Sequence, residues 1–134
     1  MNPPAELQNA VRRRAAGQCE YCRMHQELQG ATFHIEHVIP LAKGGGDEFS
    51  NLALACPSCN LHKADRVSAV DSVSGLEVPL FYPARQSWSD HFRFDGFRIK
   101  GLTPTGRATV STLDFNHARR IRIRAAEQII GLER

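Results

Sequence analysis

The four cysteines constrain this chain more than any other feature of its sequence. They form two Cys-x-x-Cys pairs, Cys19 with Cys22 and Cys56 with Cys59. Two such pairs can supply the four thiolates of a tetrahedral zinc shell, and a shell of this kind leaves no coordination position for water or substrate. We therefore predict a structural zinc ion at these residues. A redox dithiol and four unrelated buried thiols are the alternatives.

The spacing of the two pairs indicates where any chemistry must lie. Thirty-three residues separate Cys22 from Cys56, more than the ~15–20 of common zinc fingers. A zinc ion bound to both pairs would fix the two ends of this long segment, so metal binding is partly folding energy. The reactive residues are therefore expected inside the segment.

The length and composition favour one domain without a membrane span. The chain has 134 residues, of which 42% are hydrophobic, and it contains no apolar stretch near the ~18–20 residues that a bilayer requires. Its first residues lack the basic-then-apolar order of a secretory signal. We expect a cytoplasmic protein, in which disulfides are the exception.

The charge distribution says more than the net charge of +3. Residues 71–134 carry ten Lys and Arg against seven acidic residues, whereas residues 1–70 carry seven of each. Arginines cluster at two places, Arg12–Arg14 and, within six residues, Arg119, Arg120, Arg122 and Arg124. Such clusters are either solvated helix faces or phosphate contacts.

Hydrophobic periodicity and turn signals predict an α+β fold. We expect helices over 5–16, 60–67, 104–113 and 117–130, strands over 32–39 and 52–55, and C-terminal hairpins with turns at 74–75 and 95–96. Asn116 is expected to cap the last helix, with Thr103 at the start of the helix before it. The last helix should bury an apolar stripe and turn its arginines outward, the stripe being Ala118, Ile121, Ala125 and Ile129.

Three polar residues, two inside the segment and one just after the second cysteine pair, suggest a reaction. Glu36 and His37 end the first predicted strand, and Asn60 follows the last cysteine. A hairpin packed on a helix would bring these positions together. Carboxylate and amide oxygens suit Mg²⁺ or Mn²⁺, and a histidine near neutral pKa can act as general base on a water. A cation with a base is a means of phosphodiester hydrolysis.

At these positions the sequence resembles the HNH, or ββα-metal, endonuclease family in its zinc-bearing branch. The similar residues are 33–41, the glycines 44–46, the run 51–60 and Lys63. The resemblance implies a ββα-metal core with a four-cysteine zinc site. It covers about residues 17–66 of a single domain spanning 1–134, preceded by an N-terminal helix and followed by an α+β extension over about 71–134.

The resemblance also implies roles for individual residues. His37 becomes the general base, Glu36 and Asn60 the ligands of a catalytic Mg²⁺ or Mn²⁺, and Asn51 the amide that bonds across the loop and helps to orient the base. DNA is the implied substrate, cleaved to 5′-phosphate and 3′-hydroxyl ends. The sequence has Glu36 where Asp is common and Asn60 where many members carry His, and both variants occur in the family.

Some residues near the site have weaker assignments, and a second function competes. His34 shares a strand face with Glu36 and is either an auxiliary metal or phosphate contact or a structural histidine. Lys63 shares a helix face with Asn60 and is either a phosphate contact or a solvated lysine, whereas His62 points elsewhere, at best toward DNA. The alternative function is a zinc-ribbon module that binds nucleic acid or protein without cleaving. Its cysteines and arginines would look the same.

Overall fold

The computed structural model describes residues 2–132 and confirms the predicted α+β class. Within this part of the chain the strands form three two-stranded antiparallel sheets, β1 with β2, β3 with β4 and β5 with β6. The α-helices are α1 (Ala5–Ala15), α2 (Pro57–Lys63), α3 (Trp88–His91), α4 (Pro104–Thr112) and α5 (Ala118–Ile129). The strands are β1 (His34–His37), β2 (Leu52–Ala55), β3 (Ser68–Val70), β4 (Glu77–Pro79), β5 (Phe92–Asp95) and β6 (Arg98–Gly101). Short 3-10 helices lie at η1 (Gln26–Leu28), η2 (Leu41–Lys43) and η3 (Phe49–Asn51).

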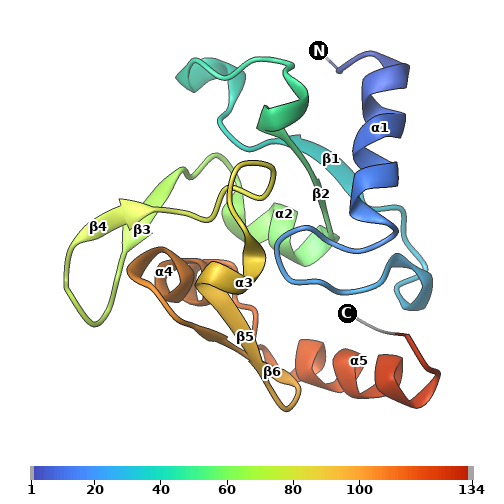
Figure 1. The fold of residues 1–134 in the computed structure, drawn as a ribbon, viewed down its shortest axis with the longest axis vertical. Helices are drawn as coiled ribbons and strands as arrows, with labels where there is room; N and C mark the ends of the chain where they lie inside the picture. The colour runs from blue at the N-terminus through green and yellow to red at the C-terminus, as the bar shows by residue number, and fades with distance from the viewer. Residues whose placement is uncertain (1, 133–134) are drawn as a thin grey trace.

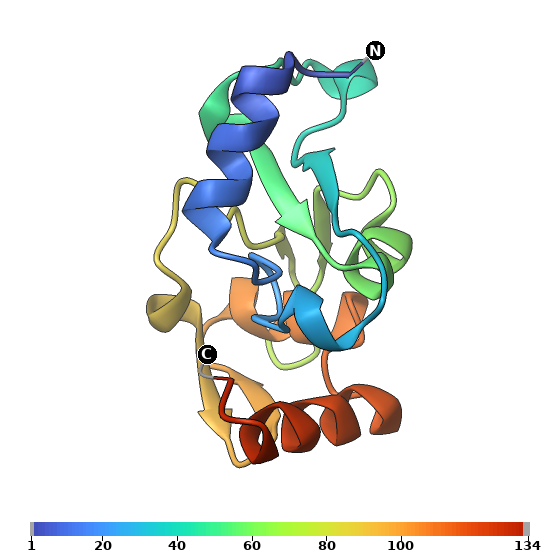
Figure 2. The ribbon, with the colours of Figure 1, turned by 90° about the vertical axis from the view of Figure 1, so that its right-hand side faces the viewer.

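The β1–β2 hairpin and α2 form the expected ββα unit. His34 pairs with Ala55 and His37 with Leu52. Every residue of β2 is buried, and α1 lies alongside this strand (Figures 1 and 2). Strand β2 matches its predicted range. Strand β1 is shorter than the predicted 32–39, because the backbone of Ile39 bonds to a side chain, that of Asn51, instead of to a neighbouring strand.

Helix α2 begins three residues before the predicted start at Asn60. Cys56 is its N-cap, and the sulfur of this residue accepts a hydrogen bond from the backbone N–H of Cys59 at 3.4 Å. Pro57 occupies the first helical turn, where its missing N–H costs nothing. Asn60 therefore lies within the helix, and an N-capping role for it is excluded.

The last helix has a different N-cap and buries a different face from those predicted. His117, not Asn116, caps α5, its Nδ1 accepting from the N–H of Arg119 at 3.1 Å. Asn116 instead bonds both backbone groups of Ile99. The predicted outward orientation of the arginines is wrong for Arg120 and Arg124, which are buried, whereas Ile129 of the predicted apolar stripe is 85% exposed.

The C-terminal segment contains the predicted hairpins and helix. Gly75 and Gly96 adopt positive φ at the two hairpin turns, and Thr103 caps α4 by accepting from the N–H of Gly106. This segment contacts the first half directly: the indole Nε1 of Trp88 donates to the backbone oxygen of Tyr21 at 2.8 Å. The organisation of residues 1–134 as one domain stays a prediction. Among residues 2–132, no helix combines the length and the apolar character needed to cross a bilayer.

Candidate metal centre and active site

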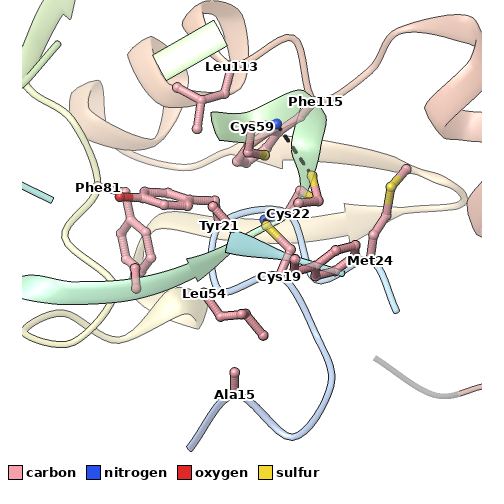
Figure 3. Close-up of a cluster of buried hydrophobic side chains, with 14 of the residues drawn as sticks. Ala15, Cys19, Tyr21, Cys22, Met24, Leu54, Cys59, Phe81, Leu113 and Phe115 are labelled. Carbon is pink, nitrogen blue, oxygen red and sulfur yellow. Dashed lines mark hydrogen bonds between the residues drawn. The ribbon is translucent and has the colours of Figure 1, made fainter. Parts of the chain in front are cut away.

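The four cysteines meet in the interior, as the two pairs predict. All four are buried, and their sulfur atoms lie within 4.8 Å of one another. Figure 3 shows Cys19, Cys22 and Cys59 among the apolar side chains of the core. The sulfurs of Cys22 and Cys56 are 3.7 Å apart. A tetrahedral zinc site with Zn–S bonds of about 2.3 Å has edges of about 3.8 Å, so the cluster fits this ion. We call these four side chains the four-thiolate centre.

Each cysteine pair is shaped by its own backbone. The N–H of Cys22 points to the sulfur of Cys19 at 3.5 Å, which repeats the contact between Cys59 and Cys56 in the second pair. Burial raises the pKa of the Cys19 and Cys59 thiols well above its usual value. Cys22 behaves oppositely: although burial alone would raise its pKa, hydrogen bonds from the other three cysteines and the charge of Arg120 lower it well below the usual value. Four thiolates together in this buried place still need positive charge, and a metal ion would supply it.

Sequence reasoning missed a buried arginine at this centre. The Nη2 atom of Arg120 lies 2.9 Å from the sulfur of Cys59 and 3.9 Å from that of Cys56. Burial alone would lower the pKa of Arg120, but the thiolates around it raise the pKa above its ordinary value. The pattern of α5 gave no signal for this role, since arginine counts as an exposed residue in hydrophobic periodicity.

Glu36 lies on the inner side of β1, where it is 9% exposed. The hydroxyl of Tyr21 donates a short hydrogen bond to Oε1, and the ammonium of Lys63 lies 3.8 Å from Oε2. Burial raises the pKa of Glu36, while Lys63, the Tyr21 hydroxyl and His37 each act to lower it. Tyr21, between the first two cysteines, is a neighbour that sequence reasoning did not identify.

Lys63 lies on the side of α2 that is turned toward β1, because its ammonium donates to the backbone oxygen of Val38 at 2.8 Å. Asn60 precedes it by three residues, about one helical turn, and is half-buried. Lys63 is only 1% exposed, so contact with a DNA phosphate would require it to leave this position. The structure thus gives Lys63 a partner in Glu36.

His37 lies at the end of β1, and its side chain is 16% exposed. Its Nε2 atom is 2.7 Å from Oδ1 of Asp47, in the loop that follows η2. Sequence reasoning missed Asp47, because nothing in the spacing of the two residues shows that this loop folds back onto the strand. The pair places a carboxylate directly beside the predicted general base.

Asn51 forms hydrogen bonds across the loop that follows β1. Its Oδ1 accepts from the N–H of Ile39 at 3.0 Å and from the hydroxyl of Tyr82 at 2.6 Å. Its Nδ2 donates to the oxygens of Ile39 and Gly46 at 3.0 and 2.9 Å. A Cβ at Gly45 would lie 1.8 Å from the oxygen of Ile39, so the loop can pass here only with glycine.

The remaining predicted residues lie around this site. His34 is exposed at the start of β1. His62 bonds the oxygen of Ser58 through Nδ1 and lies 4.0 Å from Asp114 through Nε2, so it faces the C-terminal segment. In the first arginine cluster, Arg14 is engaged within the protein, bonding Glu20 and the oxygens of Phe49 and Leu52.

Comparison with known protein families identifies the segment that contains these residues. Residues 19–66 match the model of the HNH endonuclease family. The matched segment begins at the first cysteine and ends just after α2, so it includes the ββα unit and all four cysteines. No curated protein matches the chain.

Proposed function

We propose that the HNH endonuclease domain at residues 19–66 is catalytic and hydrolyses phosphodiester bonds in DNA. One observation carries the proposal: at the end of β1, His37 is paired with a carboxylate and partly open to solvent, next to a buried Glu36 that faces α2. A module that only binds nucleic acid has no use for this combination of groups.

His37 is proposed as the general base. If Nε2–H donates to Asp47, the lone pair of the imidazole lies on Nδ1, where it can take a proton from the attacking water. Asp47 then acts as a positioning residue that fixes the tautomer and the orientation of the ring. The 16% exposure of the His37 side chain leaves the ring open to a substrate at the surface.

Glu36 and Asn60 are proposed to hold the catalytic Mg²⁺ or Mn²⁺. They offer a carboxylate and an amide oxygen on facing elements, a donor set suited to these ions. Such an ion would stabilise charge on the scissile phosphate and on the departing 3′ oxygen. Tyr21 and Lys63 hold the Glu36 carboxylate in place through its two oxygens.

Asn51 is proposed to keep the active-site loop closed. Its bonds to Ile39 and Gly46 join the residues after β1 to the glycine loop that leads to Asp47. The amide therefore supports the orientation of His37 without touching it. Exposed cations near this end of the molecule, Lys43 and Arg66, are proposed to contact DNA phosphates and to make binding sensitive to salt.

Cleavage of supercoiled plasmid tests the proposal. Purified protein is incubated with Mg²⁺, with Mn²⁺, or with EDTA followed by excess Mg²⁺, beside His37→Ala and a control, His117→Asn, whose amide oxygen can replace the Nδ1 atom of His117 as the cap of α5. We expect wild type and control to cut with Mg²⁺ or Mn²⁺, and His37→Ala to lose about 10²–10⁴-fold in rate. Circular dichroism and zinc content check that folding is unchanged.

Two outcomes contradict the proposal. A wild-type protein that binds plasmid without cutting it under any of these metals would be a binding module. Equal cleavage by wild type and His37→Ala would show that His37 is not the base.

A further inference from the structure

Arg120 connects the C-terminal helix with the four-thiolate centre. Its side chain is 2% exposed. One edge of the guanidinium faces the sulfur of Cys59, and the Nη1 atom donates to the backbone oxygens of Leu113 and Asp114 at 2.5 and 2.9 Å. The guanidinium group thus connects Cys59 with the residues that join α4 to α5.

The charge balance of the centre explains why a cation belongs there. Four thiolates outnumber the two positive charges of a zinc ion, and the excess negative charge lies in a buried place where water cannot screen it. An N–H of an arginine that points to a thiolate forms a charge-assisted hydrogen bond and offsets part of this excess. Arg120 is itself buried and needs the negative charge in return.

A second contact from the same helix reaches the first cysteine pair. The Oε2 atom of Glu127 accepts from the backbone N–H of His25 at 2.7 Å, three residues after Cys22. Helix α5 therefore contacts both halves of the centre, Arg120 at the second pair and Glu127 beside the first. By contrast, Arg119 and Arg122 on α5 are exposed.

We propose that Arg120 is an outer-sphere residue of the four-thiolate centre, through which docking of α5 and metal binding strengthen each other. Because the coupling is reciprocal, a docked α5 holds the metal more tightly, and a bound metal holds α5 more firmly. This gives the C-terminal extension a function that the ββα unit does not supply. The inference depends on the cysteines and α5 alone, and nuclease activity plays no part in it.

The test compares metal binding and metal spectra in three full-length variants. Arg120→Met removes the charge and the donors at similar length, and Arg120→Lys keeps the charge without the planar group. Arg124→Met is the matched control, a buried arginine one turn later whose Nη atoms donate to the oxygens of Phe97 and Phe115. Zinc affinity is measured by competition with a chromophoric chelator, and the Co²⁺-substituted proteins give the sulfur-to-cobalt charge-transfer band.

For Arg120→Met we expect a loss of about 10- to 100-fold in zinc affinity, typical of outer-sphere partners of a metal. The cobalt band should shift, since a thiolate that loses a hydrogen bond becomes a stronger electron donor. Arg120→Lys should fall between wild type and Arg120→Met. Arg124→Met should keep the band of the wild type, even if its melting temperature falls.

The proposal is overturned if Arg120→Met keeps both the affinity and the band of wild type. It is also overturned if Arg124→Met reproduces both changes, because general loosening of α5 would then be sufficient. If Arg120→Met does not fold, the same two comparisons are made between Arg120→Lys and Arg124→Met. An unshifted band in Arg120→Lys at wild-type affinity then counts against the proposal.

Discussion

The contribution of the contact between His37 and Asp47 to catalysis can be tested by changing a single atom of the Asp47 side chain. The 2.7 Å contact favours the imidazole tautomer with its proton on Nε2. Replacing the carboxylate by an amide keeps the size of the side chain but removes the charge that stabilises a protonated ring. A substitution at Asp47 can therefore separate a role in orienting the His37 ring from a role in stabilising the fold.

For Asp47→Asn we expect the cleavage rate at saturating DNA to fall by roughly tenfold or more, but by less than the ~10²–10⁴-fold that loss of the general base itself would cost. DNA affinity should change little. Nitrogen NMR of labelled imidazole should show a loss of the single tautomer at His37, a readout that a merely structural role would not move. Glu48→Gln, a neighbouring exposed carboxylate, is the control. A full rate in Asp47→Asn with an unchanged tautomer would contradict the positioning role.

Asn51 is a second residue whose contribution can be measured, in this case its contribution to the stability of the fold. Asn51→Asp keeps the acceptor for Ile39 N–H but turns both donors into a repulsive carboxylate beside the oxygens of Ile39 and Gly46. Asn51→Ala leaves the amide of Ile39 without its partner. We expect each change to lower the free energy of unfolding by about 1–3 kcal/mol, as urea titration would show. Wild-type stability in both variants would mean that the loop closes without this amide.

Single residues also show where sequence reasoning reaches its limit. The cysteines were predictable because spacing within Cys-x-x-Cys pairs reports their chemistry directly. Glu36 and Asn51 were identified only as positions in the family pattern, and their functional roles stay predictions. Asp47 and Tyr21 were not predictable, because their roles depend on how a loop and a knuckle fold back onto β1.

Among the elements, strand β3 is joined to helix α4 by one charged pair just beyond its end. The carboxylate of Asp71 is inaccessible to solvent and accepts from Nε and Nη2 of Arg107 at 2.8 and 3.0 Å. It also accepts from the N–H of Ser74 in the hairpin turn. The hydrogen bond with Arg107, followed by that with Ser74, lowers the pKa of Asp71 well below its usual range.

The lowered pKa gives this contact a defined pH dependence. A carboxylate with a depressed folded pKa stabilises the fold fully above its unfolded pKa of about 3.9, and this stabilisation is lost as the pH falls through the folded value. Asp71→Asn should therefore melt several degrees below wild type at pH 7, and the difference should narrow below about pH 5. Thermal melts of both proteins at matched zinc concentration measure this difference in melting temperature. A difference that widens between pH 6 and pH 4 would contradict the assignment.

The helices differ in how far their sequences predict them. Helix α4 followed its local signals, since Thr103 and Pro104 define its start without help from the rest of the fold. Helix α2 begins before its predicted start because a cysteine sulfur acts as its N-cap. Helix α5 buries a different face from the predicted one because thiolates and backbone oxygens compensate its buried arginines. The start of α2 and the buried face of α5 depend on contacts with the cysteines or with residues distant in sequence. Hydrophobic periodicity carries no information about such contacts.

At the scale of the molecule, the four-thiolate centre lies within the apolar core of the chain. The cysteines pack with Val11 of α1, Leu54 of β2 and Phe115 before α5 in one buried cluster. Structural zinc binding in small domains is worth about 10–16 kcal/mol, comparable with or above the ~5–15 kcal/mol that stabilises a typical fold. The metal-free protein should therefore unfold.

Zinc removal tests this dependence. Incubation with a strong chelator should abolish the near-ultraviolet circular dichroism and the cooperative melt, and added Zn²⁺, but not Mg²⁺, should restore both. Cys56→Ala should behave like the metal-free protein, since it removes both a ligand and the cap of α2. Zinc content by mass spectrometry accompanies each melt. An unchanged melt in metal-free protein or in Cys56→Ala would show that the fold does not need the centre.

Contacts between the two parts of the sequence run directly to the candidate site. Tyr82 bonds Asn51, Trp88 bonds the backbone of Tyr21, and Arg120 reaches Cys59. The C-terminal extension thus touches the loop support, the neighbour of Glu36 and the metal centre. None of these pairings could be read from one sequence, because each joins residues from unrelated motifs.

The late position of Arg120 has a consequence for synthesis. A chain leaves the ribosome from its N-terminus, so both cysteine pairs emerge well before Arg120, which follows Cys59 by 61 residues. A nascent chain could bind a zinc ion at that stage, but the guanidinium of Arg120 would not yet be present to support the thiolates. If Arg120 supports the centre as proposed, firm retention of the ion has to wait until α5 has been made, and shorter nascent chains should release the ion more readily to a chelator.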